Sequence, residues 1–141
     1  MYSMPLTEIN KLDAATDQLD WAIRLFLDHD AYVSAITLAG AAEEIIGKIV
    51  GPESAFNLLK LRLSEKTGLS PKIVSQAHLN KAKNWMKHWT KLEDTETIEL
   101  DLKAEAFQYI IRAITNLCSH DKSCSSETPR FVEWTMKNMS R

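Results

Sequence analysis

The sequence has few residues that turn a chain. Its 141 residues include only four glycines and four prolines, about half the share that is usual in globular proteins. Folds made of many short strands need a turn at the end of each strand, so this shortage argues against a β-sandwich or barrel. It predicts a few long helices with short connections. Hydrophobic residues at 45% and charged residues at 26% are ordinary globular values, which excludes a disordered or fibrous chain.

Several signatures of common functions are also missing. The chain has no Gly-rich phosphate loop, Walker sequence or dinucleotide fingerprint, which excludes the common nucleotide-hydrolysing folds. No His has a Glu three residues before it, which excludes a ferritin-like di-iron centre. The first residues do not form a basic segment followed by an apolar one, and no apolar run is long enough to span a bilayer. We therefore expect a cytoplasmic protein with no membrane contact and no cofactor.

The two cysteines, Cys118 and Cys124, lie six residues apart in a polar tail. A chain of this size with a full core does not need a disulfide for stability, so the sequence predicts reduced thiols. Together with His120 the two thiols offer three soft metal ligands, which is the alternative interpretation. An obvious fourth ligand and a familiar zinc spacing are missing, so we expect no metal site.

Apolar residues spaced by threes and fours predict six helices. Thr7 is the expected N-cap of the first helix and Asp30 that of the second. Gly40 and Gly47 are seven residues apart and share one face of the second helix, which predicts the close approach of a neighbouring helix there. The expected helices span, in chain order, about residues 7–28, 31–50, 52–66, 71–89, 102–118 and 129–139.

These helices predict a single all-α domain. We expect an antiparallel up-and-down bundle of four long helices, with a short third helix and a C-terminal helix. The core bundle covers about residues 7–118, and the tail with its short helix covers 119–141. The helix over 31–50 has little polar circumference, so it is expected to be the most buried.

The formal net charge of −2 hides a local asymmetry. Between Glu65 and Glu93 the chain has lysines but no acidic residue, and an acidic stretch follows over residues 93–101. The fourth predicted helix is therefore basic. Its segment carries Lys66, Lys72, Lys81, Lys83, Lys87 and Lys91.

Polar side chains form a stripe along this helix. Asn80, Asn84 and His88 follow each other at intervals of four residues, with Lys83 and Lys87 on the flank of the stripe. Amide, ammonium and imidazole groups can donate hydrogen bonds to a phosphodiester oxygen, and an imidazole can also move protons near neutral pH. A solvated charged face is the alternative. We predict a nucleic-acid-binding surface whose contacts are Asn80, Lys81, Lys87 and Lys91.

The segment from Lys83 to His88 resembles the motif of the HEPN superfamily, the higher eukaryotes and prokaryotes nucleotide-binding domain. That motif has an Arg followed by a polar residue, often Asn, and then a His after four to six intervening positions. The order of elements is also similar: an amphipathic first helix, a second helix rich in small residues over 38–44, the motif in the fourth helix, and a closing helix. The resemblance covers about residues 8–118.

This resemblance implies a homodimer that brings two copies of the motif into one basic cleft. Active members are metal-independent endoribonucleases, so His88 would be the acid/base group, Lys83 the phosphate contact and Asn84 the orienting residue. Lys83 stands where the family pattern has Arg, and lysine lacks the planar fork of the guanidinium. We therefore expect RNA or nucleotide binding with weak or lost ribonuclease activity. Many members lie beside toxin–antitoxin or mobile-element genes, which implies an antitoxin-like protein partner.

A non-catalytic interaction or dimerisation module is the alternative function. In that interpretation Trp85 and Trp89 bury against a partner, and the lysines only keep the surface soluble. The same two indoles could stack on bases in an RNA-binding protein. Glu44, on the buried second helix, is expected to pair with Lys48 at i+4 rather than to form a carboxylate site.

Overall fold

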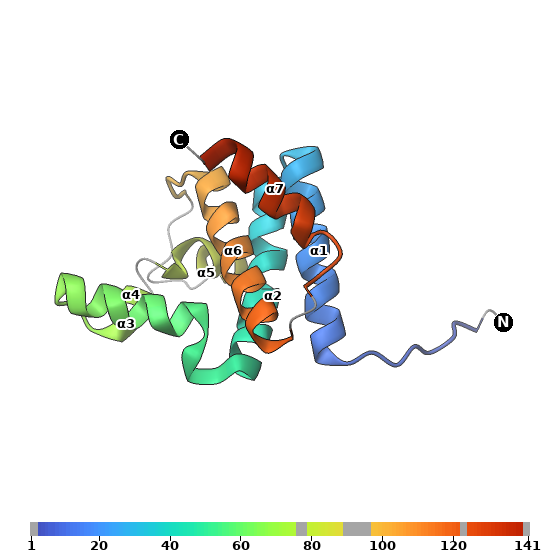
Figure 1. The fold of residues 1–141 in the computed structure, drawn as a ribbon, viewed down its shortest axis with the longest axis horizontal. Coiled ribbons are helices and arrows are strands. Elements are labelled where there is room, and N and C mark those ends of the chain that lie inside the picture. The colour runs from blue at the N-terminus through green and yellow to red at the C-terminus, as the bar shows by residue number, and fades with distance from the viewer. Residues whose placement is uncertain (1–2, 76–78, 89–96, 122–123, 140–141) are drawn as a thin grey trace.

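The computed structural model describes residues 3–75, 79–88, 97–121 and 124–139, and its regular structure in these ranges is entirely helical. This confirms the all-α class. None of the helices in these ranges combines the length and the apolar content needed to cross a bilayer. The elements (Figure 1) are α1 Lys11–His29, α2 Tyr32–Val50, the 3-10 turn η1 Gly51–Glu53, α3 Ala55–Thr67, α4 Pro71–Val74, α5 Lys81–Lys87, α6 Leu102–His120 and α7 Thr128–Met139.

The core lies between α1, α2 and α6, which have 19 residues each. Helix α2 has extensive contacts with both of the others, as expected for the most apolar helix. Helix α7 lies across the end of this layer, where Phe131 and Trp134 pack on Phe26 with ring centroids 5.4 and 5.0 Å from it. The closing helix thereby completes the core.

The first two helices begin later than predicted. The N-cap of α1 is Asn10, whose side chain accepts the N–H of Asp13 at 2.8 Å and donates to the Asp13 carboxylate. The Asn10 side chain satisfies one of the free N–H groups at the start of the helix, so Asn10 and not Thr7 is the cap. Asp30 has a φ of 50° and ends α1 in the left-handed conformation, and its side chain makes no cap hydrogen bond to α2. The predicted caps at Thr7 and Asp30 are therefore wrong.

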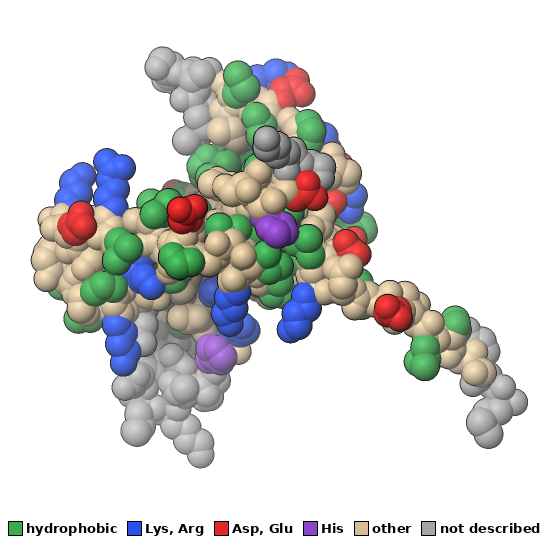
Figure 2. Space-filling model, turned by 60° about the horizontal axis from the view of Figure 1, so that its bottom comes forward, with side chains coloured by type: hydrophobic (Ala, Val, Ile, Leu, Met, Phe, Trp, Pro, Cys, Tyr) green, Lys and Arg blue, Asp and Glu red, His purple; other side chains and the backbone are tan. Residues whose placement is uncertain are grey.

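Three predicted breaks are confirmed. Gly51 and Gly68 adopt φ values of 84° and 76°, which favour glycine, and each follows a helix end. Ser70 caps α4 by accepting the N–H of Ile73, and Pro71 follows it. These signals define a projecting arm made of α3 and α4, seen at the left of Figures 1 and 2.

The predicted continuous helix over 71–89 is wrong. Its described parts are the short helices α4 and α5, with Ser75 and Leu79 between them in π-helical geometry, and His88 is already extended, with φ −127° and ψ 151°. An unbroken helix would join the Lys83 N–H to the Leu79 carbonyl. Instead the Lys83 N–H donates to the Tyr109 hydroxyl at 3.2 Å, and the Leu79 carbonyl accepts both terminal nitrogens of Arg112 at 3.3 Å. Two side chains of α6 replace the helix hydrogen bond, so the described residues form three helices of 19 residues where four long helices were expected.

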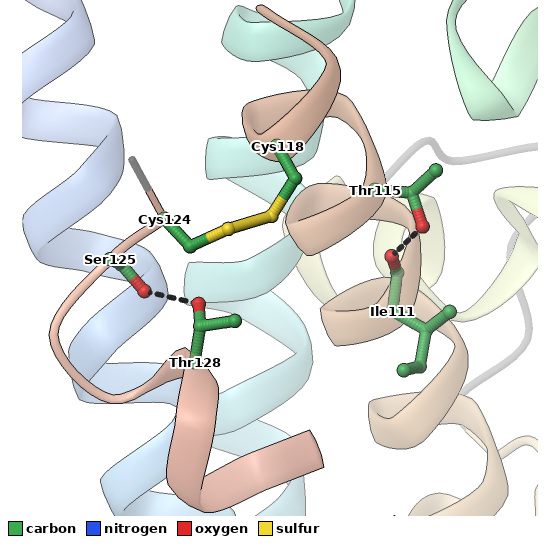
Figure 3. Close-up of a disulfide and its surroundings, with 6 residues drawn as sticks. All are labelled: Ile111, Thr115, Cys118, Cys124, Ser125 and Thr128. Atoms are coloured by element: carbon green, nitrogen blue, oxygen red, sulfur yellow. Dashed lines mark hydrogen bonds between the residues drawn. A yellow bond between two sulfur atoms is a disulfide. The ribbon is translucent and has the colours of Figure 1, made fainter. Parts of the chain in front are cut away.

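The prediction of free thiols is also wrong. Cys118, in the last turn of α6, and Cys124, before α7, form a disulfide with their Cα atoms 5.3 Å apart (Figure 3). The chain reverses direction after α6, which brings the two residues together. This pairing removes both thiolates from the alternative metal site with His120, and no group of His, Cys, Asp and Glu within the described ranges is arranged to hold a metal ion.

Candidate functional site

A buried ion pair joins α2 to α6 next to the candidate site. Glu43 on α2 and Arg112 on α6 are 3% and 2% exposed, and Oε1 of Glu43 lies 3.7 Å from Nε of Arg112. The guanidinium also stacks over Tyr109, 4.5 Å from its ring centroid. Burial raises the pKa of Glu43, and the charges of Arg112 and Lys83 oppose that rise. Arg112 bonds to the carbonyl of Leu79, and the hydroxyl of Tyr109 accepts the N–H of Lys83. These two side chains of α6 therefore fix where α5 begins.

Three lysines converge on the next residue of α2. Nζ of Lys83 lies 3.4 Å from Oε2 of Glu44, Nζ of Lys87 lies 3.9 Å from the same atom, and Nζ of Lys48 lies 3.9 Å from Oε1. Partial burial disfavours ionisation of Glu44, but the three ammonium groups outweigh it and lower its pKa. We call Glu44 with Lys48, Lys83 and Lys87 the lysine cluster. It confirms the predicted pairing of Glu44 with Lys48.

The lysine cluster carries an excess of positive charge. Three ammonium groups around one carboxylate leave two unbalanced positive charges, whereas Glu43 and Arg112 balance each other. The side chains of Lys48 and Lys87 are largely exposed, and that of Lys83 is only 8% exposed. Lys48 and Lys87 can therefore turn toward an anion, while Lys83 holds the carboxylate in place.

A cavity of about 510 Å³ opens beside the lysine cluster, between α2, η1, α3 and α5. This volume lies within the range of small-molecule sites. The wall combines two lysines, the carboxylates of Glu43 and Glu44, amides, hydroxyls and one aromatic ring. The residues relevant to binding are Lys48, Lys83, Asn57, Asn80, Ser75 and Phe56.

One polar atom in this wall has no partner. Oδ1 of Asn80 is buried and accepts no hydrogen bond, while Nδ2 of the same residue lies 3.5 Å from the Ser75 hydroxyl. Buried acceptors are normally satisfied. Asn80 lines the cavity, so a turn of its side-chain amide brings this buried oxygen to a ligand that presents an N–H or O–H group.

A second cavity of about 440 Å³ lies on the other side of Glu44. It is lined by Lys11, Lys48 and Lys87 and has an apolar floor that includes Ile45 and Ile49. Glu44 and Lys48 border both cavities. The lysine cluster is thus a positively charged ridge between two hollows.

The structure separates the residues of the predicted motif. Asn80 and Lys83 line the first cavity, whereas Asn84 and His88 line neither of the two cavities beside Glu44. Asn80 precedes α5 and His88 follows it, so the predicted polar stripe on one continuous helix is not formed. His88 is exposed at the end of α5.

The remaining predicted contacts lie at the edge of this site or beyond it. Lys81 is exposed in the first turn of α5, and Lys87 belongs to the lysine cluster. Trp85 is half-buried on the same helix. Trp89 and Lys91 lie outside the described residues, as does the beginning of the acidic stretch at 93–96.

Sequence reasoning missed the support of the site, Glu43 with Arg112. A signal for it exists, because Glu43 and Arg112 are opposite charges placed within the most apolar stretches of two core helices. Charged residues in such positions are almost always paired when they are buried.

The charges, the cavity volume and the free Asn80 oxygen favour an anionic ligand that also carries hydrogen-bond donors. No protein-family model, curated protein or solved structure matches the chain significantly.

Proposed function

We propose that this protein binds RNA or a nucleotide, with a phosphate at the lysine cluster and the attached nucleoside in the first cavity. The observation that supports it is the convergence of Lys48, Lys83 and Lys87 on Glu44 at the wall of that cavity. Lysines bind phosphate as point charges. The two unbalanced charges match one phosphate, and Glu44 keeps the ammonium groups together when the ligand is absent.

The rest of the cavity suits a nucleoside. Phe56 lines it, and an aromatic ring can stack on any base. Once the amide of Asn80 turns toward the cavity, its Oδ1 can accept a hydrogen bond from a ribose hydroxyl or a base amine. The lysine cluster can therefore bind the phosphate, Phe56 can stack on the base, and Asn80 can bond to the ribose or the base.

Binding of a fluorescein-labelled single-stranded RNA, followed by fluorescence anisotropy, tests this proposal. The double variant Lys48→Ala/Lys87→Ala is expected to lower the affinity at least about tenfold, or about 1.4 kcal/mol, because it removes the two exposed phosphate contacts. An unlabelled nucleoside monophosphate should compete with the RNA for the wild-type protein.

The matched control is Lys66→Ala/Lys72→Ala. It removes the same charge from exposed positions on α3 and α4, and it should leave the affinity close to that of the wild type. Equal losses in the two double variants would mean that RNA responds only to overall charge, which contradicts a site at the lysine cluster.

We further propose, from the resemblance to the HEPN superfamily, a homodimer with weak metal-independent ribonuclease activity. In this proposal His88 is the acid/base group and Asn84 orients it, while Lys83 steadies the phosphate through its charge from the position where it holds Glu44. The exposed position of His88 at the end of α5 supports a role on a substrate that reaches beyond the first cavity.

Incubation with mixed RNA and a chelator tests the role of His88. We expect slow cleavage by the wild type and none by His88→Ala, with an unchanged melting temperature because the imidazole is exposed. His29→Ala, which removes another exposed imidazole from the end of α1, is the control and should cleave normally. Equal rates for the wild type and His88→Ala would exclude His88 as the catalytic group.

A further inference from the structure

Helix α3 differs from α1, α2 and α6 because none of its 13 residues is buried. Its inner side, with Phe56 and Leu63, is only partly covered, and its outer side is exposed. With α4 it forms the arm that projects from the layer of α1, α2 and α6 (Figure 1). The core therefore does not explain why this segment is rich in leucine.

The outer face of α3 is apolar. Leu58 and Leu61 are 55% and 50% exposed, and their spacing of three residues places them side by side on the helix. Leu59 is also exposed next to them, and Leu69 and Ile73 are exposed further along the arm. Figure 2 shows hydrophobic side chains spread over this arm at the left. Single exposed leucines are ordinary, but a group of them on one projecting arm is typical of an interaction surface.

Basic residues border these leucines. Arg62 lies four residues after Leu58, and Lys66 lies four residues after Arg62, so both follow the same outer face. Residues 55–74 include four basic side chains and one acidic side chain, which gives this segment a net charge of +3. They are Lys60, Arg62, Lys66 and Lys72 against Glu65.

The positive charge of the arm distinguishes among the partners that could cover the outer face of α3. Two copies of the arm packed face to face would bring like charges together, which is unfavourable. Phosphates of a nucleic acid would match the basic side chains but would leave Leu58 and Leu61 exposed. A protein helix with an apolar stripe edged by carboxylates matches both features.

We propose that the outer face of α3 docks an acidic amphipathic helix of a partner protein. Apolar side chains of the partner, spaced by three and four residues, contact Leu58 and Leu61. Carboxylates on either side of that stripe pair with Arg62 and Lys66. The 13 residues of α3 offer about three and a half turns of contact, which suits a short helical segment.

Selection from a displayed library of helical peptides of about 14 residues, roughly four turns, tests this proposal. Peptides are selected on the wild-type protein and counter-selected on Leu58→Ser/Leu61→Ser. The selected sequences should be acidic and amphipathic. Their affinity, measured by fluorescence anisotropy, should fall at least about tenfold in Leu58→Ser/Leu61→Ser and in Arg62→Glu/Lys66→Glu.

The control is Val132→Ser/Met136→Ser, an exposed apolar pair on α7 that is 41% and 66% exposed in the wild type. It should leave the peptide affinity unchanged, and melting temperatures should show that all three double variants fold. Failure to select any peptide, or selection of basic peptides, would overturn the proposal. So would a wild-type homodimer that Leu58→Ser/Leu61→Ser dissociates, or an RNA affinity that the same variant abolishes, because the face would then belong to a second copy or to RNA.

Discussion

Arg112→Met will lower the free energy of unfolding by about 3–5 kcal/mol, the cost of removing one partner from a buried ion pair. The substitution keeps most of the side-chain volume but leaves the Glu43 carboxylate buried without its guanidinium partner. It also deprives the Leu79 carbonyl of both its donors. Urea denaturation monitored by circular dichroism measures the change.

A double variant separates the ion pair from simple packing. Glu43→Leu/Arg112→Met replaces both charges with apolar groups, so it should recover at least half of the stability lost in Arg112→Met. A loss below about 1 kcal/mol in the single variant would show that the pair does not hold α2 and α6 together.

The stability of Arg112→Met should also depend on pH. Burial raises the pKa of Glu43 in the folded protein, so folding takes up a proton in the window between the unfolded and the folded pKa. Stability therefore rises as the pH falls through that window. Removal of Arg112 takes away the charge that opposes this rise in the pKa. The loss in free energy of unfolding of Arg112→Met relative to the wild type should thus be smaller at about pH 5 than at about pH 8. Glu43→Leu/Arg112→Met lacks the carboxyl group, so its loss should not change in this way.

Gly40→Ala will cost about 2 kcal/mol of stability, within the range for overpacking. A Cβ atom at Gly40 would lie 2.5 Å from Cδ and 2.9 Å from Cγ of Lys83. Lys83 has little room to move, because its side chain is 8% exposed and its N–H is bonded to Tyr109. The clash outweighs the gain of about 1 kcal/mol in helix propensity. Thermal and urea denaturation measure the difference.

Gly47→Ala is the matched control on the same face of α2. A Cβ atom there would lie 3.4 Å from Nδ2 of Asn116, its nearest neighbour. The contact is tolerable and the propensity gain remains, so the stability should change little or rise. Equal losses at Gly40 and Gly47 would contradict the close approach of Lys83 to Gly40.

The sequence was sufficient for features that depend on neighbouring residues. Gly51 before Pro52, Gly68, and Ser70 before Pro71 end or start helices through their own backbone preferences, and each was predicted. The apolar faces of the long helices follow from periodicity in the same way. The break between α4 and α5 was not predictable, because the hydrogen-bonding groups of Arg112 and Tyr109 come from 33 and 26 residues away.

The candidate site also combines features that are predictable from local sequence with features that depend on how the helices pack. The run of lysines over residues 81–91 is visible in the sequence, and Glu44 with Lys48 follows from helical spacing. The meeting of Lys83 and Lys87 with Glu44 is not visible, because it depends on how α5 packs on α2. The stripe of Asn80, Asn84 and His88 failed because its spacing assumed helix beyond Lys87, where the chain is extended.

The salt dependence of RNA binding tests the phosphate-binding role of the lysine cluster most directly. The logarithm of the association constant should fall linearly with the logarithm of the salt concentration, because bound lysines release counterions from the RNA. Lys48→Ala/Lys87→Ala should reduce the steepness of that line by about 0.7, the change expected when one phosphate is no longer neutralised, while Lys66→Ala/Lys72→Ala keeps the wild-type slope. A wild-type affinity that does not respond to salt, or a slope that Lys48→Ala/Lys87→Ala leaves unchanged, would contradict RNA binding at this site.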